Sequence, residues 1–160
     1  QAILALESKV VDFAAVTSPL AIQKPLHKTH LASYREILIG GTKYKELASQ
    51  IRSLNDLSGI PFIGLADGTG SRELYHRYFL SHGLMFAPDM EAATTDQILP
   101  MITHNLGIGF YPEELAAEAI ARGSAYAIRL VEPIPEREIC LVTNSSTQMS
   151  AAVRKVISFL

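Results

Sequence analysis

The sequence has a single cysteine, no tryptophan and no strong excess of charge of either sign. Because Cys140 is the lone cysteine, an internal disulfide is excluded, and no cluster of Cys and His has the spacing of a zinc site. The 14 basic residues are scattered among 16 acidic ones, and the net charge is −2. Duplex binding depends on clustered Lys and Arg, so we expect this chain to make no DNA contact of its own. We also expect it to bind no metal and no cofactor.

Long hydrophobic runs are also missing, and none approaches the roughly 20 residues that span a bilayer. No basic-then-apolar signal segment opens the printed sequence, so we expect a cytoplasmic protein with no membrane partner. The sequence starts at Gln1, inside a helix-like stretch, which suggests a piece of a longer polypeptide. Its 160 residues, 48% of them hydrophobic, are enough to bury a core.

Short apolar runs suited to buried strands alternate with helix-like segments along the whole chain. This alternation predicts an α/β fold with mainly parallel strand pairing. Residues 20–33 are interrupted by Pro25 and by polar side chains, and we expect loop and short extended pieces there. Strands are expected at 10–16, 35–41, 61–66, 90–93, 108–111, 125–131 and 139–142, and helices at 72–82, 96–104, 112–121 and 148–160.

A turn of small residues just before the predicted helix at 72–82 is the strongest chemical feature. Gly68 and Gly70 allow backbone amides to converge, and the helix that follows adds partial positive charge. The hydroxyls of Thr69 and Ser71 can donate to a carboxylate, phosphate or sulfate, and Arg72 can pair with it. The alternative is a capped turn without a ligand, with Arg72 in a structural ion pair.

Four segments resemble, in order, parts of the effector-binding domain of LysR-type bacterial transcriptional regulators. VVDFAAVTSP is similar to the place where a strand of the first lobe ends at the effector cleft. SLNDLSGIPFIGLADGTGSRE resembles the entry into the second lobe, and REICLVTNSS resembles the return to the first. EAATTDQILPMITHNLGIGFYPEELA resembles the family's order of helix, glycine turn, strand and proline, and is the most specific match.

The resemblance implies a periplasmic-binding-protein-like domain of two lobes with mainly parallel sheets. Residues 1–54 and 132–160 would form an incomplete first lobe, and 55–131 a complete second lobe. The N-terminal helix-turn-helix that reads DNA in this family is absent from the sequence. The implied function is to bind a small, anionic metabolite between the lobes and thereby control DNA binding and transcription. A homodimer or homotetramer is the implied assembly, with DNA reached through the missing domain.

The family positions also imply further effector contacts, each with a simpler structural alternative. Thr94 and Thr95 precede a helix, so that one can cap it while the other faces the cleft, and we favour Thr95 slightly. The glycines around Gly109 allow a tight reversal of the chain, and the resemblance implies that Gly109 also leaves room beside a ligand. Together with the turn at 68–72, the implied effector-binding residues are Thr17, Ser18, Pro19, Thr94, Thr95 and Gly109.

Two other classes of protein share this architecture. A solute-binding protein of the same fold would be exported and carry a signal segment. An enzyme built on the fold would need titratable groups converging on the cleft, whereas the candidate residues are chiefly neutral hydroxyls. Hydroxyls and amides suit recognition better than proton transfer, so we expect a sensor and not an enzyme.

Overall fold

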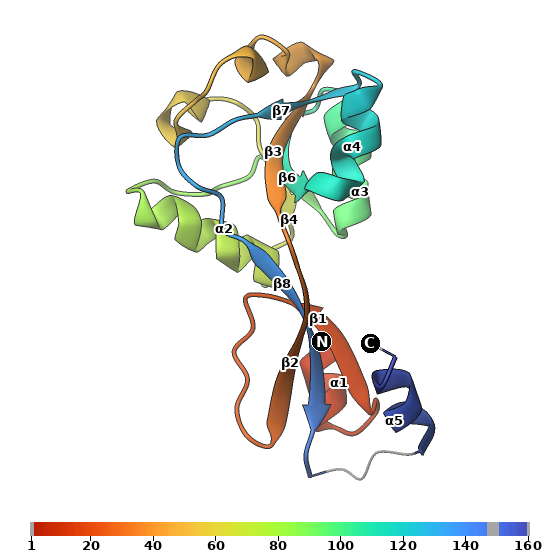
Figure 1. The fold of residues 1–160 in the computed structure, drawn as a ribbon. Coiled ribbons are helices and arrows are strands. Elements are labelled where there is room, and N and C mark those ends of the chain that lie inside the picture. The colour runs from red at the N-terminus through yellow and green to blue at the C-terminus, as the bar shows by residue number, and fades with distance from the viewer. Residues whose placement is uncertain (1, 147–150, 160) are drawn as a thin grey trace. The chain divides into compact units, whose positions relative to one another are not determined.

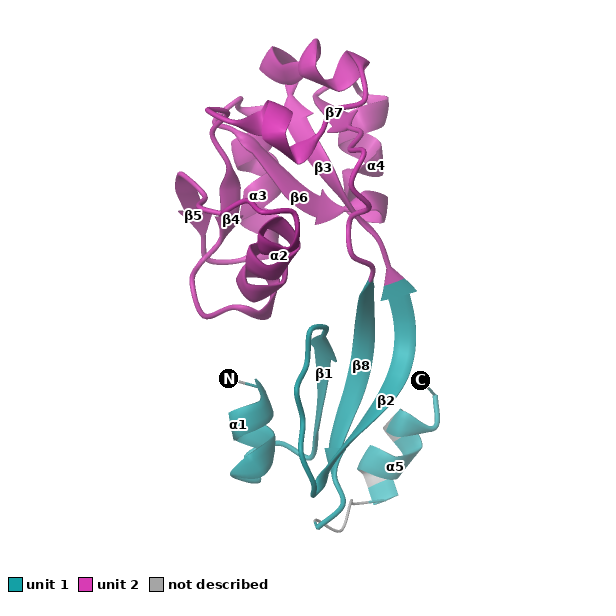
Figure 2. Cartoon of the chain, turned by 90° about the vertical axis from the view of Figure 1, so that its left-hand side faces the viewer, with its two compact units in different colours: residues 1–33, 137–160 teal, residues 34–136 magenta. Residues whose placement is uncertain are grey.

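The computed structural model describes residues 2–146 and 151–159, and within them the chain forms two compact units (Figure 2). Unit 1 comprises residues 1–33 and 137–160, and unit 2 comprises residues 34–136. The sequence expectation placed the lobe boundaries at 54/55 and 131/132 instead. Residues 36–41 belong with unit 2 because they form a strand in the middle of its sheet, hydrogen-bonded on both sides.

Unit 1 is built on a three-stranded sheet in the order β1-β8-β2. The antiparallel pair of β1 and β8 runs from Phe13 opposite Thr143 to Thr17 opposite Ile139. Leu6, Leu26 and Val142 form its small buried core. The elements are α1 (Ala2–Glu7), β1 (Phe13–Thr17), β2 (Leu26–Tyr34), β8 (Arg137–Asn144) and α5 (Ala151–Ile157).

Strand β2 corrects the expectation of loop over residues 20–33. The segment LHKTHLASY lies extended over nine residues, although most of its side chains are exposed. Its neighbour in the sheet is β8, which lies more than 100 residues later in the sequence. The predicted C-terminal helix is present as α5, and its expected residues 148–150 and 160 lie outside the described residues.

Unit 2 contains a sheet with helices on both sides, as Figure 1 shows for α2 on one side and α3 and α4 on the other. Its strands form the order β6-β3-β7 and the pair β4-β5, joined by a parallel bridge between Phe62 and Ile108. The strands are β3 (Glu36–Gly41), β4 (Ile63–Leu65), β5 (Met90–Ala92), β6 (Ile108–Pro112) and β7 (Ala125–Ile128). The α-helices are α2 (Gly70–Ser81), α3 (Thr95–Thr103) and α4 (Glu113–Ala121), with short 3-10 turns at Thr42–Tyr44, Leu47–Ser49 and Leu54–Leu57.

The strand pairing is mixed, which corrects the expectation of mainly parallel pairs. β1 pairs with β8 antiparallel, β3 pairs with β6 and with β7 antiparallel, and β4 and β5 are parallel. The strand that runs antiparallel to its neighbours is β3 in unit 2, and β8 in unit 1 is antiparallel to β1. Each of these two strands begins just after the chain passes from one unit to the other. The other strands of unit 2 run in one direction. β6 and β7 are both antiparallel to β3, and β4 and β5 run parallel to β6.

The core of unit 2 lies on both faces of this sheet, because successive strand residues point to opposite sides. On β3, Leu38 packs into a cluster rich in aromatic rings under α2, and Ile39 packs into an aliphatic cluster under α3 and α4. The ring of Tyr75 on α2 stacks on Phe110 of β6, with centroids 4.0 Å apart and planes 8° from parallel. This stacking fixes α2 against the sheet and so fixes the direction in which its N-terminus points.

None of the helices within the described part of the chain is both long and apolar enough to cross a membrane.

Candidate functional site

The glycine turn before α2 forms a helix cap. Gly68 has φ +77°, the left-handed region that glycine occupies without strain. Thr69 is the N-cap residue, and its Oγ1 accepts a hydrogen bond of 3.2 Å from the backbone N–H of Arg72. The same hydroxyl donates to the carbonyl of Ala66 at 2.9 Å. The hydroxyl of Thr69 therefore already serves the start of the helix, which is the simpler of the two roles expected for it.

Arg72 lies over the strands β4 and β5. Its Nη1 donates to the carbonyl of Leu65 at 3.2 Å and to Oε1 of Glu91 at 3.1 Å, and its guanidinium lies 5.6 Å from the ring centroid of Phe86. The side chain is 18% exposed, whereas that of Glu91 is 49% exposed. Arg72 thus makes the structural ion pair that the sequence left open as an alternative to anion binding.

The two threonines at the start of α3 occupy different positions: Thr94 is the N-cap residue, and Thr95 is the first residue of the helix. Thr94 is the N-cap residue, but its side chain makes no capping hydrogen bond, and it is exposed. The nearby backbone N–H of Ala93 is instead satisfied by Oε1 of Gln97 at 2.9 Å. Thr95 is partly buried and lines a pocket of unit 2, and Thr94 does not.

This pocket brings the N-terminal turns of α2 and α3 together. Ser71 comes from α2, Thr95 comes from α3, and Arg72 lies beside them. The free volume is about 20 Å³, room for roughly one water-sized group. The remaining lining residues are Glu36, Ile63, Gly64, Leu65, Tyr75, Phe86, Ile98 and Phe110.

Two polar residues of this pocket were not predicted as site residues, namely Glu36 and Tyr75. Glu36 is 7% exposed at the start of β3, and the hydroxyl of Tyr75 donates to its Oε2. Tyr75 lies four residues after Ser71 on α2, and residues at that spacing share one face of a helix. That spacing was the available signal for Tyr75. Nothing local distinguished Glu36 from an exposed strand residue.

Gly109 does not line the pocket, and its place in β6 has a packing reason. It lies opposite Ile39, and an added Cβ would be 2.9 Å from the carbonyl oxygen of Ile63 and 3.4 Å from side-chain atoms of Ile98 and Ile102. A side chain there would press on the backbone of β4. The close approach of these strands therefore requires glycine, whatever else the residue does.

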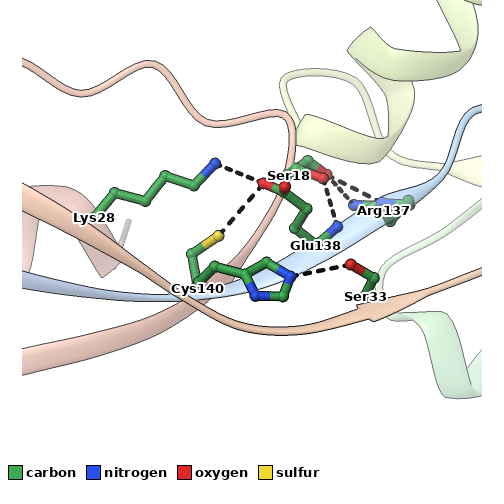
Figure 3. A network of polar contacts seen from close by, with 7 residues as sticks. Ser18, Lys28, Ser33, Arg137, Glu138 and Cys140 are labelled. Carbon is green, nitrogen blue, oxygen red and sulfur yellow. Dashed lines mark hydrogen bonds and ion pairs between the residues drawn. The ribbon is translucent and has the colours of Figure 1, made fainter.

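In unit 1, the turn at the end of β1 is held by Arg137 (Figure 3). The guanidinium of Arg137, 2% exposed, donates to the carbonyl of Ser18 from Nε at 3.0 Å and from Nη2 at 2.7 Å, and to Oγ1 of Thr17 at 3.0 Å. Ser18 Oγ accepts from the backbone N–H of Glu138 at 2.8 Å, and a cis peptide bond follows between Ser18 and Pro19. Both hydroxyls of this turn thus have partners inside unit 1. Sequence reasoning singled out the turn and missed Arg137.

A second polar cluster lies along β2 and β8 (Figure 3). Lys28 Nζ lies 2.6 Å from Oε2 of Glu138, and the thiol of the buried Cys140 donates to the same oxygen at 3.8 Å. The hydrogen bond from Lys28 is the main cause that lowers the pKa of Glu138, and the same bond raises the pKa of Lys28. His30 and Ser33 form a separate hydrogen bond of 3.0 Å on β2. Cys140 is fully buried in β8, where its thiol packs as a small apolar side chain.

The fold and these polar groups define a ligand-binding domain of two α/β units, in which unit 2 presents two helix N-termini to one pocket. A family model described as the LysR substrate binding domain matches residues 1–160. The chain therefore belongs to the LysR substrate binding domain family, which confirms the resemblance seen in the sequence.

A curated relative is the HTH-type transcriptional regulator YeiE of Escherichia coli K12, described as uncharacterized. It is 23% identical over 142 residues, which make up 86% of this chain and 48% of the relative. The chain thus spans about half the length of that regulator.

Several solved structures share the fold. The effector binding domain of QuiR, in complex with shikimate, matches with a TM-score of 0.81 at 16% identity over 98% of this chain and 73% of that one. The regulatory domain of Synechocystis PCC6803 CcmR, in complex with 2-PG, matches with a TM-score of 0.82 at 16% identity over 98% and 75%. The bromide-bound regulatory domain of HypT from Salmonella typhimurium has a TM-score of 0.81 at 16% identity over 99% and 75%. These likenesses establish the periplasmic-binding-protein-like fold.

Proposed function

We propose that this chain senses a small effector carrying an acidic group, and that the pocket lined by Ser71 and Thr95 forms part of the effector site. The observation that carries the proposal is the meeting of the N-terminal turns of α2 and α3 at one pocket. Each helix N-terminus has backbone N–H groups without partners inside the helix and carries partial positive charge. Two such ends, with a hydroxyl from each, favour an anionic ligand.

The ligands of similar domains agree with an acidic effector. One related domain was solved with shikimate, which is a carboxylate, and another with bromide ion. In our proposal the turn at 68–72 and Thr94 support the contacts that Ser71 and Thr95 make in unit 2, and Thr17, Ser18 and Pro19 stay predicted effector contacts. Arg72 contributes through its position beside the pocket, since its guanidinium is already bonded to Glu91. Gly109 contributes by packing.

The effector acts in this proposal as a binding switch. A ligand that prefers one conformation of the domain shifts a pre-existing equilibrium by the difference between its affinities for the two conformations. In the regulator, that shift changes how homodimer or homotetramer partners hold DNA-binding domains on a promoter. DNA contact is assigned to a separate domain because this chain has a net charge of −2 and scattered basic residues. The site of action is then the bacterial cytoplasm, and the domain catalyses no reaction.

The proposal is tested by a thermal-shift screen of the chain against carboxylates, phosphates and halides. A ligand at one hundred times its Kd stabilises the native state by about 2.7 kcal/mol, which raises Tm by several degrees. Ser71→Ala and Thr95→Val are expected to weaken binding of any hit. Ser81→Ala and Thr103→Val are matched controls, because these residues end the same two helices and their hydroxyls bond to Tyr78 and Pro100 carbonyls.

Two results would count against this function. One is the absence of any saturable shift across the panel. The other is a hit whose affinity falls equally in the test and control variants, because that pattern would place the ligand away from the N-termini of α2 and α3.

A further inference from the structure

A second and larger pocket of unit 2 lies at the amino ends of the parallel strands β4 and β5. Most of its lining comes from residues 54–60, which precede β4, and residues 84–89, which precede β5. We call it the amino-end pocket. The hydroxyls of Ser71 and Thr95 belong to segments that follow the same strands, and Phe86 lines both pockets. The amino-end pocket is therefore separate from the effector pocket proposed above.

The apolar part of the amino-end pocket is already assembled. The buried rings of Phe62, Phe79 and Phe86 contact one another, with centroids 5.7, 5.6 and 5.0 Å apart. Leu54 and Leu57 extend this apolar lining, and both are buried. The free volume is about 390 Å³. Sites for small molecules have volumes of roughly 300–1,000 Å³ and are lined mainly by apolar and aromatic side chains. The pocket thus has room for an apolar body of about one aromatic ring.

The charge at this pocket is negative. Among the described residues of its lining, Asp89 is the one that carries a charge. Its Oδ2 accepts a hydrogen bond of 2.9 Å from the backbone N–H of Phe62, which holds the carboxylate beside the aromatic rings. Asp89 is exposed and forms no ion pair with another described residue. Helix α2 ends at Ser81, shortly before residues 84–89, and the C-terminus of a helix adds partial negative charge.

We infer that the amino-end pocket binds a small amphiphilic cation. Its ammonium group lies at the carboxylate of Asp89, and its apolar body lies against Phe62, Phe79 and Phe86. An acid is repelled by Asp89, and a small cation without an apolar body leaves the aromatic lining in contact with water. The inference does not depend on the proposed function, because the effector pocket with its two helix N-termini favours the opposite charge.

The test follows the binding of phenethylamine to the full chain by NMR of the methionine methyl groups. Met85 lines the pocket and is 80% exposed, so its methyl signal reports on occupancy. Met101 packs against the aliphatic cluster under α3 and is the internal reference. We expect a saturable shift of the Met85 signal and little change at Met101. The Met85 signal is assigned by its loss in Met85→Leu.

Two further ligands separate the contributions of charge and of apolar contact. Ethylamine keeps the ammonium group and lacks the ring, so it is expected to bind about tenfold or more weakly than phenethylamine. Phenethyl alcohol keeps the ring and lacks the charge. It is expected to bind about threefold more weakly, because the ion pair that it loses is exposed to solvent.

Asp89→Asn removes the charge and keeps an oxygen for the N–H of Phe62. It is expected to weaken phenethylamine binding about threefold and to leave phenethyl alcohol unchanged. Asp56→Asn is the matched control. Asp56 also accepts a backbone N–H, that of Ser53 at 2.8 Å, and it lies in the turn beside the pocket without lining it. A loss confined to Asp89→Asn and to the amine supports the inference.

Three results would overturn the inference. One is the absence of a saturable Met85 shift with phenethylamine. Another is equal affinity of the wild type for the amine and the alcohol, a comparison that needs no variant to fold. The third is an equal loss in Asp89→Asn and Asp56→Asn, which would indicate general surface charge. None of these ligands is an acid, so each of these results leaves the proposed acid sensor standing.

Discussion

Tyr75 donates its phenolic hydroxyl to the carboxylate of Glu36, a residue 39 positions earlier in the chain. The bond joins α2 to the first residue of β3, and both side chains are buried. It therefore combines two roles. It gives a buried carboxylate a hydrogen-bond donor, and it fixes a wall of the pocket to which Ser71 and Thr95 belong.

Removing the Tyr75 hydroxyl is expected to destabilise the fold. Tyr75→Phe keeps the ring on Phe110 but takes a donor from a buried charged acceptor, which costs about 1–3 kcal/mol. The free energy of unfolding in urea measures this loss.

Tyr44→Phe provides the contrasting control. The hydroxyl of Tyr44 is buried, and it finds no hydrogen-bond partner among the residues that the structure describes. Removing it deletes an unsatisfied polar group, so the change is expected to be neutral or stabilising. Equal losses in the two variants would mean that the bond between Tyr75 and Glu36 contributes nothing specific.

A substitution at Gly109 separates packing from ligand contact. Gly109→Ala places a Cβ 2.9 Å from the carbonyl oxygen of Ile63, and overpacking of this kind typically costs about 1–3 kcal/mol. Gly68→Ala meets no atom within 4 Å, but its φ of +77° disfavours a side chain by roughly 1–2 kcal/mol.

The two variants are distinguished by adding Gly68→Asn to the urea series. Asn tolerates the left-handed region, so it is expected to recover part of the stability at Gly68. At Gly109 the larger Asn is expected to be worse than Ala, because the obstacle is backbone of β4. A Gly109→Ala protein as stable as the wild type would refute the packing explanation.

Local sequence signals predicted those parts of the candidate site whose structure depends on neighbouring residues. The glycine turn and the hydroxyls at Thr69, Ser71 and Thr95 were predictable, because caps and helix starts depend on neighbours in the sequence. Glu36 and Arg137 were missed. Their partners Tyr75 and Ser18 lie 39 and 119 residues away, and no period or motif connects such distant positions.

The same reasoning explains which elements of the fold were predictable. α2, α3 and α4 combine helix-forming segments with clear start or stop residues, and each predicted helix lies within two residues of its observed bounds. β2 has mostly exposed side chains, so its sequence carries no apolar alternation, and its extended form comes from its place beside β8. The antiparallel direction of β3 likewise carries no local signal, because it is defined by the neighbours β6 and β7, which lie far away in the sequence.

The ion pair between Lys28 and Glu138 is expected to make stability depend on pH at both ends of the scale. The pKa of Glu138 is lowered by the hydrogen bond from Lys28, so its contribution is present above the ordinary value of 4.5 and is lost as the pH falls below it. The pKa of Lys28 is raised by the same bond, so its contribution is present below 10.5 and is lost as the pH rises above that value.

Lys28→Met is therefore expected to flatten the urea midpoint as a function of pH below 4.5, since Glu138 then loses its main cause of a lowered pKa. Lys24→Met, outside this cluster, is the charge-matched control. Both side chains are partly exposed, at 33% and 42%, so the effect should shrink in high salt. A Lys28→Met profile identical to that of the wild type would show that the pair does not form in solution.

Arg137 is expected to be the most sensitive position in unit 1, because its guanidinium is 2% exposed and three of its hydrogen bonds go to the turn at Thr17 and Ser18. Arg137→Gln leaves the carbonyl of Ser18 short of its charged donors, which should cost several kcal/mol and lower Tm strongly. Arg137→Lys keeps the charge but loses the forked donor, so an intermediate loss is expected.

A double-mutant cycle with Thr17→Val isolates the bond between the two side chains. Thr17→Val alone should cost about 1 kcal/mol, and it should cost almost nothing once Arg137 is replaced by Lys, because residues in one hydrogen-bond network are not additive. Thr29→Val, an exposed change on β2, should be additive with Arg137→Lys and serves as the reference. If Thr17→Val is additive as well, the hydroxyl of Thr17 is independent of Arg137 and remains available to a ligand.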